Sequence, residues 1–142
     1  MHLTRRDFGR LGLGAAAALA AVPAGALSLA DRTKEAILAF TGGVEPALGG
    51  IELNTPEIAE NGSTVPVDVA SAEAKRIMLL ADGNPNPGVA TFRFGRLSPA
   101  RSAATRIRLA ATQEVIAVAE LNDGAFTMVS KTVKVTIGGC GG

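Results

Sequence analysis

The amino-acid sequence predicts an all-β protein: an immunoglobulin-like antiparallel β-sandwich, preceded by one helix and followed by a flexible glycine arm. Three observations support this fold class. Short runs of Val, Ile, Leu and Ala alternate with turn residues after Gly50, a segment before them has helical spacing, and the sequence closes on Gly-Gly-Cys-Gly-Gly. Seven short strands separated by turns are typical of two packed antiparallel sheets.

The first 26 residues have the pattern of an export signal. Arg5 and Arg6 precede an apolar run over residues 11–22, and small residues follow at 24–26. Charge, a short apolar stretch and small residues in this order are typical of a secretory signal, and the run is too short for a good membrane span. The paired arginines resemble a twin-arginine signal. We therefore expect cleavage after Ala26, with Ser28-Leu29-Ala30 as the alternative site, followed by a periplasmic location and no membrane attachment.

Removal of this segment takes away His2, the only histidine. Without an imidazole, Ser-His-Asp and Cys-His catalysis are excluded, and so are histidine-based zinc or copper sites. The formal net charge of +1 argues against a nucleic-acid partner, which usually requires a clear basic excess. We expect residues 27–137 to form one immunoglobulin-like domain, with its N-terminal helix, that is not an enzyme and has neither a metal nor a cofactor.

The helix is expected over residues 28–40. Ser28 followed by Asp31 fits a capping box, and Gly42 is a suitable stop. The apolar face that would dock on the sandwich has helical spacing and contains Leu29, Thr33, Ala36, Ile37 and Phe40.

The strands are expected from residue 50 onward. Their ranges are 50–54, 64–70, 74–80, 90–94, 104–109, 113–121 and 125–137. The last range alternates between apolar and polar residues, so one face should be buried and the other wet. The range 113–121 is apolar on both faces, which is typical of a central strand or of a surface that binds a partner.

Cys140 is the only cysteine, and it lies between Gly138-Gly139 and Gly141-Gly142. Because glycine has no side chain to pack, we expect residues 138–142 to form a free arm that does not fold back on the sandwich. Five extended residues reach at most about 17 Å, enough to enter a narrow tunnel in another protein. An exposed cysteine invites oxidation in an exported protein, so this thiol needs a function. We interpret Cys140 as a covalent attachment point.

Two alternatives remain open from the residues. A ubiquitin-like carrier would also end in Gly141-Gly142, although an export signal and an all-β pattern count against it. An exported immunoglobulin-like interaction domain would instead use its lone cysteine for an intermolecular disulfide.

The terminal Gly-Gly-Cys-Gly-Gly motif resembles that of the SoxY family of thiosulfate-oxidation carriers. The leader, the segment 51–62 and the loop Asn84-Pro85-Asn86-Pro87 fit the same family. The resemblance implies a heterodimer with SoxZ and transient docking to SoxAX, SoxB and, where present, SoxCD. It also implies that Cys140 carries the sulfur intermediates, as S-thiosulfonate and persulfide species. Haem-containing SoxAX would attach thiosulfate, dimanganese SoxB would release sulfate, and SoxCD would oxidise the remaining sulfane sulfur.

Overall fold

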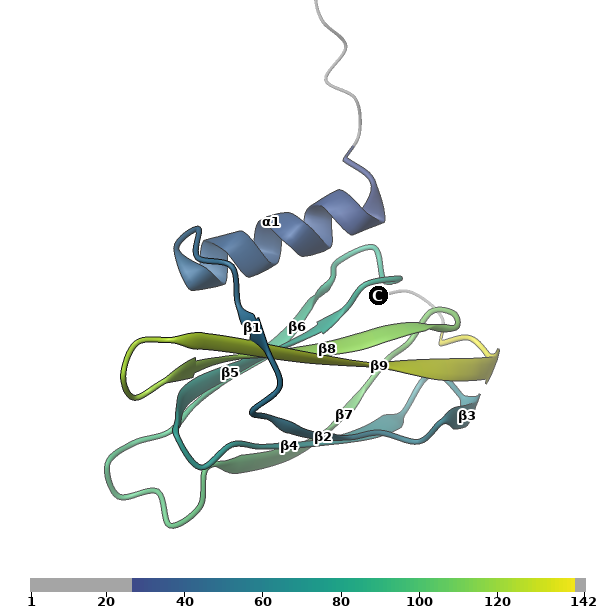
Figure 1. The fold of residues 1–142 in the computed structure, drawn as a ribbon. Coiled ribbons are helices and arrows are strands. Elements are labelled where there is room, and N and C mark those ends of the chain that lie inside the picture. Colours follow the sequence, from purple (N-terminus) through teal and green to yellow (C-terminus); the bar gives the residue numbers. More distant parts are fainter. Residues whose placement is uncertain (1–26, 140–142) are drawn as a thin grey trace, which may run out of the picture.

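The computed structural model describes residues 27–139, which form two packed β-sheets with one helix on the outer face of the larger sheet (Figure 1). The expected signal peptide over residues 1–26 lies outside the described residues. So do Cys140, Gly141 and Gly142. The structure therefore tests the predictions made for the sandwich, the helix and the first two glycines of the expected arm.

The larger sheet has six strands in the order β1-β9-β8-β5-β6, with β3 also paired to β9. These strands are β1 (Ala47–Leu48), β3 (Ile58–Asn61), β5 (Ala74–Ala81), β6 (Gly88–Arg93), β8 (Gln113–Leu121) and β9 (Phe126–Ile137). The smaller sheet has the order β2-β4-β7, formed by β2 (Glu52–Asn54), β4 (Val65–Ala70) and β7 (Ser102–Ile107). All neighbouring strands are antiparallel except β1 and β3, which both run parallel to β9.

The main core lies between the two sheets. Because successive side chains of a strand point to opposite faces, every second residue of β4 and of β8 is available to it. Val65, Val67 and Val69 of β4 are almost fully buried, and Val115 and Ala117 of β8 belong to the same apolar cluster. In β4 the alternation of valine with other residues therefore sets which face of the strand is inside.

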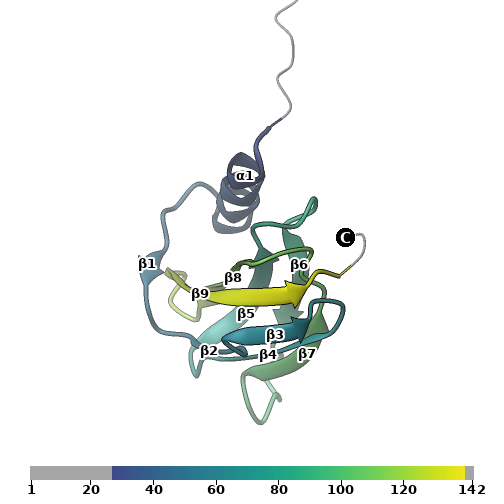
Figure 2. The same cartoon turned by 90° about the vertical axis from the view of Figure 1, so that its right-hand side faces the viewer.

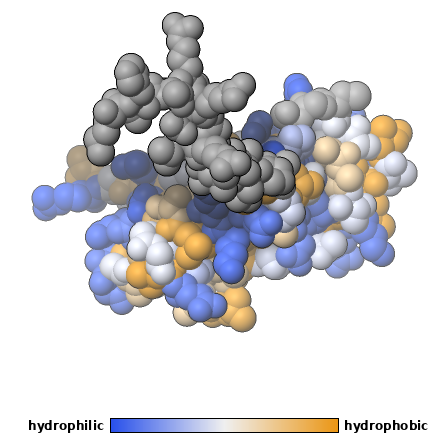
Figure 3. All heavy atoms as spheres, turned by 90° about the horizontal axis from the view of Figure 1, so that it is seen from above, coloured by the Kyte–Doolittle hydropathy of each residue, from blue (hydrophilic) through white to orange (hydrophobic). Residues whose placement is uncertain are grey.

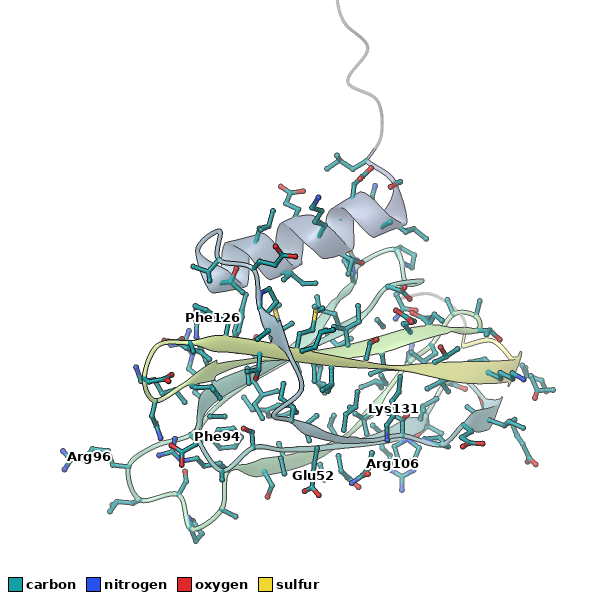
Figure 4. The ribbon with its side chains drawn as sticks, viewed as in Figure 1. Glu52, Phe94, Arg96, Arg106, Phe126 and Lys131 are labelled. Atoms are coloured by element: carbon teal, nitrogen blue, oxygen red, sulfur yellow. The ribbon has the colours of Figure 1, made fainter. Side chains whose placement is uncertain are left out.

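A second apolar cluster fills the space between the larger sheet and helix α1 (Leu29–Thr41). It contains Ile116 and Val118 from the second face of β8, together with Phe40 of the helix. The Phe40 and Phe126 rings meet edge to face with centroids 6.2 Å apart. Phe126 lies below the C-terminal part of α1 (Figure 4). Strand β8 is thus covered on both faces within this chain, which favours the central-strand interpretation of its two-sided apolar pattern.

The two ends of α1 are capped as the sequence predicts. The Ser28 hydroxyl accepts a hydrogen bond from the Asp31 backbone N–H, and the Asp31 carboxylate accepts from Ser28 in return. Gly42 adopts a left-handed conformation with φ of 67° and ends the helix by donating to the Leu38 carbonyl. Glycine suits this position because a side chain disfavours positive φ.

The sandwich and its N-terminal helix are confirmed, and strand β8 begins and ends at the residues predicted for it. The sequence analysis did not predict β1 or β3. These two short strands lie along the outer edge of β9 and add parallel pairs to a sheet that is otherwise antiparallel. They are too short to show a clear alternation of apolar and polar residues.

The outer surface visible from the helix side carries small groups of hydrophobic residues among hydrophilic ones (Figure 3). Among residues 27–139, the structure has no helix that combines the length and apolar character needed to span a bilayer.

Candidate functional site

Strand β9 leads directly into the C-terminal motif. It is 12 residues long and ends at Ile137, where it lies beside β3 with Asn61 opposite Ile137 (Figure 2). The side chain of Thr112, just before β8, also accepts a hydrogen bond from the Val135 N–H at 3.0 Å. The root of the motif is therefore fixed by neighbours on both sides of β9.

Beyond Ile137, the backbone joins a closed set of three hydrogen bonds. The Gly62 N–H donates to the Ile137 carbonyl at 2.7 Å, and the Leu109 N–H donates to the Gly62 carbonyl at 2.7 Å. The Gly139 N–H then donates to the Leu109 carbonyl at 2.9 Å. We call this arrangement of Gly62, Leu109 and residues 137–139 the glycine clasp.

The glycines of the clasp are required by close backbone approach. A Cβ atom on Gly138 would overlap the Ala110 carbonyl oxygen, and one on Gly139 would lie 2.8 Å from the Gly62 carbonyl oxygen. A Cβ atom on Gly62 would overlap the Leu109 carbonyl oxygen. No larger residue fits these places without a backbone shift.

One expectation for the C-terminal arm is therefore wrong. Gly138 and Gly139 were expected to stay clear of the sandwich because glycine has no side chain to pack. Instead, Gly139 is buried and both residues lie against the body of the protein through their backbones. The missing side chain is what allows two backbones to come this close.

The turn that carries Gly62 is shaped by its neighbours. The Asn61 side chain accepts hydrogen bonds from the Ser63 N–H at 2.9 Å and from the Ser63 hydroxyl. An asparagine that bonds to its own backbone two residues on is typical of a tight turn. The Asn61-Gly62 pair signals this turn in the sequence, but nothing local shows that the turn meets the C-terminal glycines.

The remaining site predictions concern Cys140, Gly141 and Gly142, which lie outside the described residues. Covalent geometry places the Cys140 Cα about 3.8 Å from that of Gly139. Within residues 27–139, no group of three or more His, Cys, Asp or Glu side chains is arranged to hold a metal ion.

Comparison with known proteins identifies a family that shares the sandwich and the cysteine that follows it. The model of the family described as sulfur oxidation protein SoxY matches residues 37–140, a range that ends on the cysteine. The solved structure of the sulfur carrier protein SoxY from Chlorobium limicola f thiosulfatophilum is 32% identical, with a TM-score of 0.66. The match covers 75% of this chain and 94% of that one. A sequence search of curated proteins found no match.

Other solved structures share the fold at much lower identity. The superoxide reductase neelaredoxin from Ignicoccus hospitalis is 17% identical with a TM-score of 0.54, covering 61% of this chain and 80% of that one. A hypothetical protein from Pyrococcus horikoshii is 14% identical with a TM-score of 0.52, covering 68% and 99%. At this level the likeness shows the fold alone.

The fold and the terminal motif together define a class: β-sandwich proteins whose last strand continues into a glycine-flanked cysteine. The family match extends over most of the chain and includes that cysteine. The chain belongs to the SoxY family of sulfur oxidation proteins.

Proposed function

We propose that this chain is a periplasmic sulfur carrier that holds thiosulfate-derived intermediates covalently on Cys140. The observation that carries the proposal is the sole cysteine, set between two glycine pairs at the point where the SoxY family match ends. The relative from Chlorobium limicola is itself described as a sulfur carrier protein. The twin-arginine pattern of the leader supports the periplasmic location.

The thiol is suited to the chemistry that a carrier needs. A cysteine thiolate and thiosulfate can join through a new S–S bond, with two electrons passing to an oxidising partner. The product is a cysteine S-thiosulfonate. Water then attacks the terminal sulfonate, and the S–S bond beside it breaks. Sulfate and two protons leave, while a persulfide anion remains on the cysteine. The first step needs the cysteine thiolate as the nucleophile, and in the second step the leaving atom is the sulfane sulfur that the cysteine carries.

The partner enzymes would supply the redox and hydrolytic groups in this proposal. SoxAX would take up the two electrons, SoxB would carry out the hydrolysis, and SoxCD, where present, would oxidise the remaining sulfane sulfur. SoxZ would be the second subunit of the carrier. This chain would contribute the thiol and its delivery, with no resident cofactor and no metal.

The glycine clasp limits how far Cys140 can travel. With the clasp closed, Gly139 is held against Leu109, so the Cys140 Cα can lie no farther than about 3.8 Å from this docked position. With the clasp open, three residues can extend from Ile137 and carry the cysteine roughly 10 Å outward. Delivery into a narrow tunnel therefore requires Gly138 and Gly139 to leave their places against Leu109 and Ala110.

Cys140→Ser tests the proposal directly. A serine hydroxyl is far less acidic than a thiol and cannot form a sulfur–sulfur bond. We expect the variant to fold and export normally but to lose thiosulfate-dependent turnover in a system reconstituted with the host's Sox enzymes. Removing a sulfur atom at a chain end should change the free energy of unfolding by less than about 0.5 kcal/mol.

The intact mass of the protein purified from its host separates this function from the alternatives. Wild-type protein should carry sulfur adducts on Cys140, and Cys140→Ser protein should carry none. A covalent dimer without adducts would favour the disulfide-linked interaction domain. Substantial thiosulfate-dependent turnover by Cys140→Ser would rule out the carrier function.

A further inference from the structure

The loop between β5 and β6 contains a buried polar residue that the proposed function leaves unexplained. Asn84 is only 5% exposed, and it begins the Asn84-Pro85-Asn86-Pro87 segment. A buried amide must be hydrogen-bonded, because leaving its donors and acceptor without partners is costly. The partners of Asn84 therefore indicate what it holds in place.

The Asn84 side-chain amide is hydrogen-bonded to residues 108–110, the segment on which Gly139 docks. Its Nδ2 donates to the Arg108 carbonyl at 2.7 Å, and its Oδ1 accepts from the Ala110 N–H at 3.0 Å. These two hydrogen bonds fix Arg108 and Ala110, the residues on either side of Leu109. The Leu109 carbonyl is the acceptor for the Gly139 N–H.

A second buried amide stands behind the first. Gln113 is 6% exposed, and its Nε2 donates to the Asn84 Oδ1 at 2.9 Å and to the Ala111 carbonyl at 3.0 Å. Its Oε1 accepts from the Gly83 N–H at 2.8 Å. Four of these hydrogen bonds connect the β5–β6 loop to residues 108–113, and the fifth, from Gln113 to the Ala111 carbonyl, lies within that segment.

The prolines and the helix hold this loop from the other side. Pro85 disfavours helical backbone at Asn84. The Pro85 carbonyl accepts a hydrogen bond from Arg32 of α1 at 3.0 Å, and the Pro87 carbonyl accepts from the Ala81 N–H at 2.8 Å. Asn84 is therefore presented to the Leu109 segment from a loop that is itself fixed.

We propose that Asn84, supported by Gln113, is the positioning residue of the C-terminal arm. By holding Leu109 and Ala110 in one conformation, it keeps intact the surface on which Gly138 and Gly139 dock. It thereby sets the balance between the closed and the open clasp. The effect on the delivery of Cys140 rests on the proposed function. The docking of Gly138 and Gly139 does not depend on sulfur chemistry.

Asparagine suits this role because its side chain offers a donor and an acceptor on one short planar group. Alanine would remove both bonds around Leu109, whereas the β-sandwich core would keep its apolar contacts. A purely structural role for Asn84 would lower stability without a specific effect on the arm. The positioning role and the purely structural role therefore predict different rates of amide hydrogen exchange at Gly139.

The test compares the full mature chain, with any co-purifying subunit, as wild type and as Asn84→Ala. Amide hydrogen exchange measured by NMR reports on the Gly139 N–H, which is hydrogen-bonded only while the clasp is closed. We expect the Gly139 exchange rate to rise about tenfold or more in Asn84→Ala, because this bond opens locally. The exchange rate of Ala117 in central strand β8 should rise no more than the loss of global stability requires.

Val67→Ala is the matched control. Val67 is fully buried in β4, in the other sheet, and is neither one of the clasp residues nor a hydrogen-bond partner of Asn84. The variant should lower global stability while leaving Gly139 exchange as in the wild type. If Asn84→Ala does not fold, Gln113→Leu removes the supporting amide instead and should raise Gly139 exchange by a smaller factor.

Turnover by the partner enzymes gives a second measurement, in which the direction of the change in KM distinguishes the two roles of Asn84. If the closed clasp holds the arm back, loosening it should lower the KM for the carrier several-fold while kcat stays the same. A merely unstable carrier would show the opposite, a raised KM.

Unchanged Gly139 exchange in folded Asn84→Ala protein would overturn the inference, as would a raised KM or an equal increase of Gly139 exchange in Val67→Ala. None of these outcomes would affect the result of the Cys140→Ser experiment.

Discussion

Single glycines decide how the end of this chain behaves. Gly62, Gly138 and Gly139 come from two distant parts of the sequence, and each is placed where another backbone comes too close for a Cβ atom. None of the three needs a positive φ, unlike the helix-ending Gly42. All three allow close contact between two backbones.

Gly62→Ala should destabilise the protein and open the clasp together. A Cβ atom there would overlap the Leu109 carbonyl oxygen and lie 2.8 Å from both the Gly139 nitrogen and Val135 Cγ1. Overpacking of this kind costs about 1–3 kcal/mol, which urea denaturation measures directly.

Gly95→Ala provides the control for Gly62→Ala. An added Cβ atom on Gly95 meets nothing within 4 Å, and its φ is not in the left-handed region. Its unfolding free energy should stay within about 0.5 kcal/mol of the wild type. Equal denaturation midpoints for the two variants would show that the clasp yields without strain.

The residue to which the proposed function assigns the sulfur was evident from the sequence, but the conformation of the backbone that leads to it was not. Cys140 is the only cysteine and is flanked by glycines, so the sequence alone singles it out. The docking of Gly139 on Leu109 depends on a contact between residues 30 positions apart in the sequence, and Asn84 acts through the same segment. The local run of glycines predicts a freely moving backbone in either case, because it carries no information on whether a distant segment contacts it.

Among the secondary-structure elements, helix α1 does the most to complete the larger sheet. It covers the second face of β8, and a polar contact ties its C-terminal end to β5. The Arg76 guanidinium lies 4.2 Å from the centre of the Phe40 ring, donates to the Phe40 carbonyl at 3.0 Å and forms an ion pair with Glu120. Both charged side chains are less than one third exposed.

Arg76→Met should loosen the end of the helix. It removes the bond to the Phe40 carbonyl, the contact with the aromatic ring and the partner of a largely buried Glu120. We expect a loss of about 1–3 kcal/mol in the free energy of unfolding. Lys75→Met is the matched control, because the Lys75 ammonium is 3.8 Å from Glu120 and its side chain is 51% exposed.

Exposed ion pairs contribute little, so Lys75→Met should change stability by less than about 0.5 kcal/mol. Chemical denaturation of both variants decides the matter. A similar small effect in the two would mean that Arg76 does not fasten the helix.

The other end of α1 should respond to pH. Hydrogen bonds from the Ser28 side chain and backbone hold the pKa of the Asp31 carboxyl below its ordinary value of 3.8. A lowered pKa in the folded state means that the stabilisation is complete above 3.8 and is lost as the pH falls through the folded value. Ser28→Ala should raise the Asp31 titration midpoint, measured by NMR, towards 3.8.

Asp31→Asn supplies the control for that titration. It removes the ionisable group, so acid should no longer weaken the first turn of α1 through this position. A midpoint that is the same with and without the Ser28 hydroxyl would show that the capping box does not shift the carboxyl.

The longer elements could be predicted because their patterns are strong. The two-sided apolar run of β8 and the capped helix α1 were placed within one residue of their observed ends. Strands β1 and β3 could not, because they contain two and four residues and are defined by pairing with β9. Short parallel edge strands depend on a distant partner more than on their own residues.

At the scale of the whole molecule, the sandwich covers its central strand without help from another protein. The two-sided apolar pattern of β8 therefore no longer argues for a partner, and the proposed heterodimer rests on membership of the SoxY family. Native mass spectrometry of protein purified from its host would show whether a second subunit is present.

Export should depend on the two arginines of the leader. Changing both Arg5 and Arg6 to Lys keeps the positive charge but removes the pair that a twin-arginine signal requires. We expect uncleaved precursor to accumulate inside the cell, detected by fractionation and by the mass of the N-terminal peptide. Normal appearance of the mature protein in the periplasm would exclude this export route.

The pairing of β9 has a mechanical consequence. Along its last residues this strand is bonded to β3 on one edge, and along most of its length it is bonded to β8 on the other. A partner that pulls on the terminal cysteine along the strand axis loads these bonds in shear, all at the same time. Bonds loaded together resist far more force than bonds peeled off one by one. The clasp should therefore yield first, so that tension lengthens the tether while the sandwich that bears it stays folded.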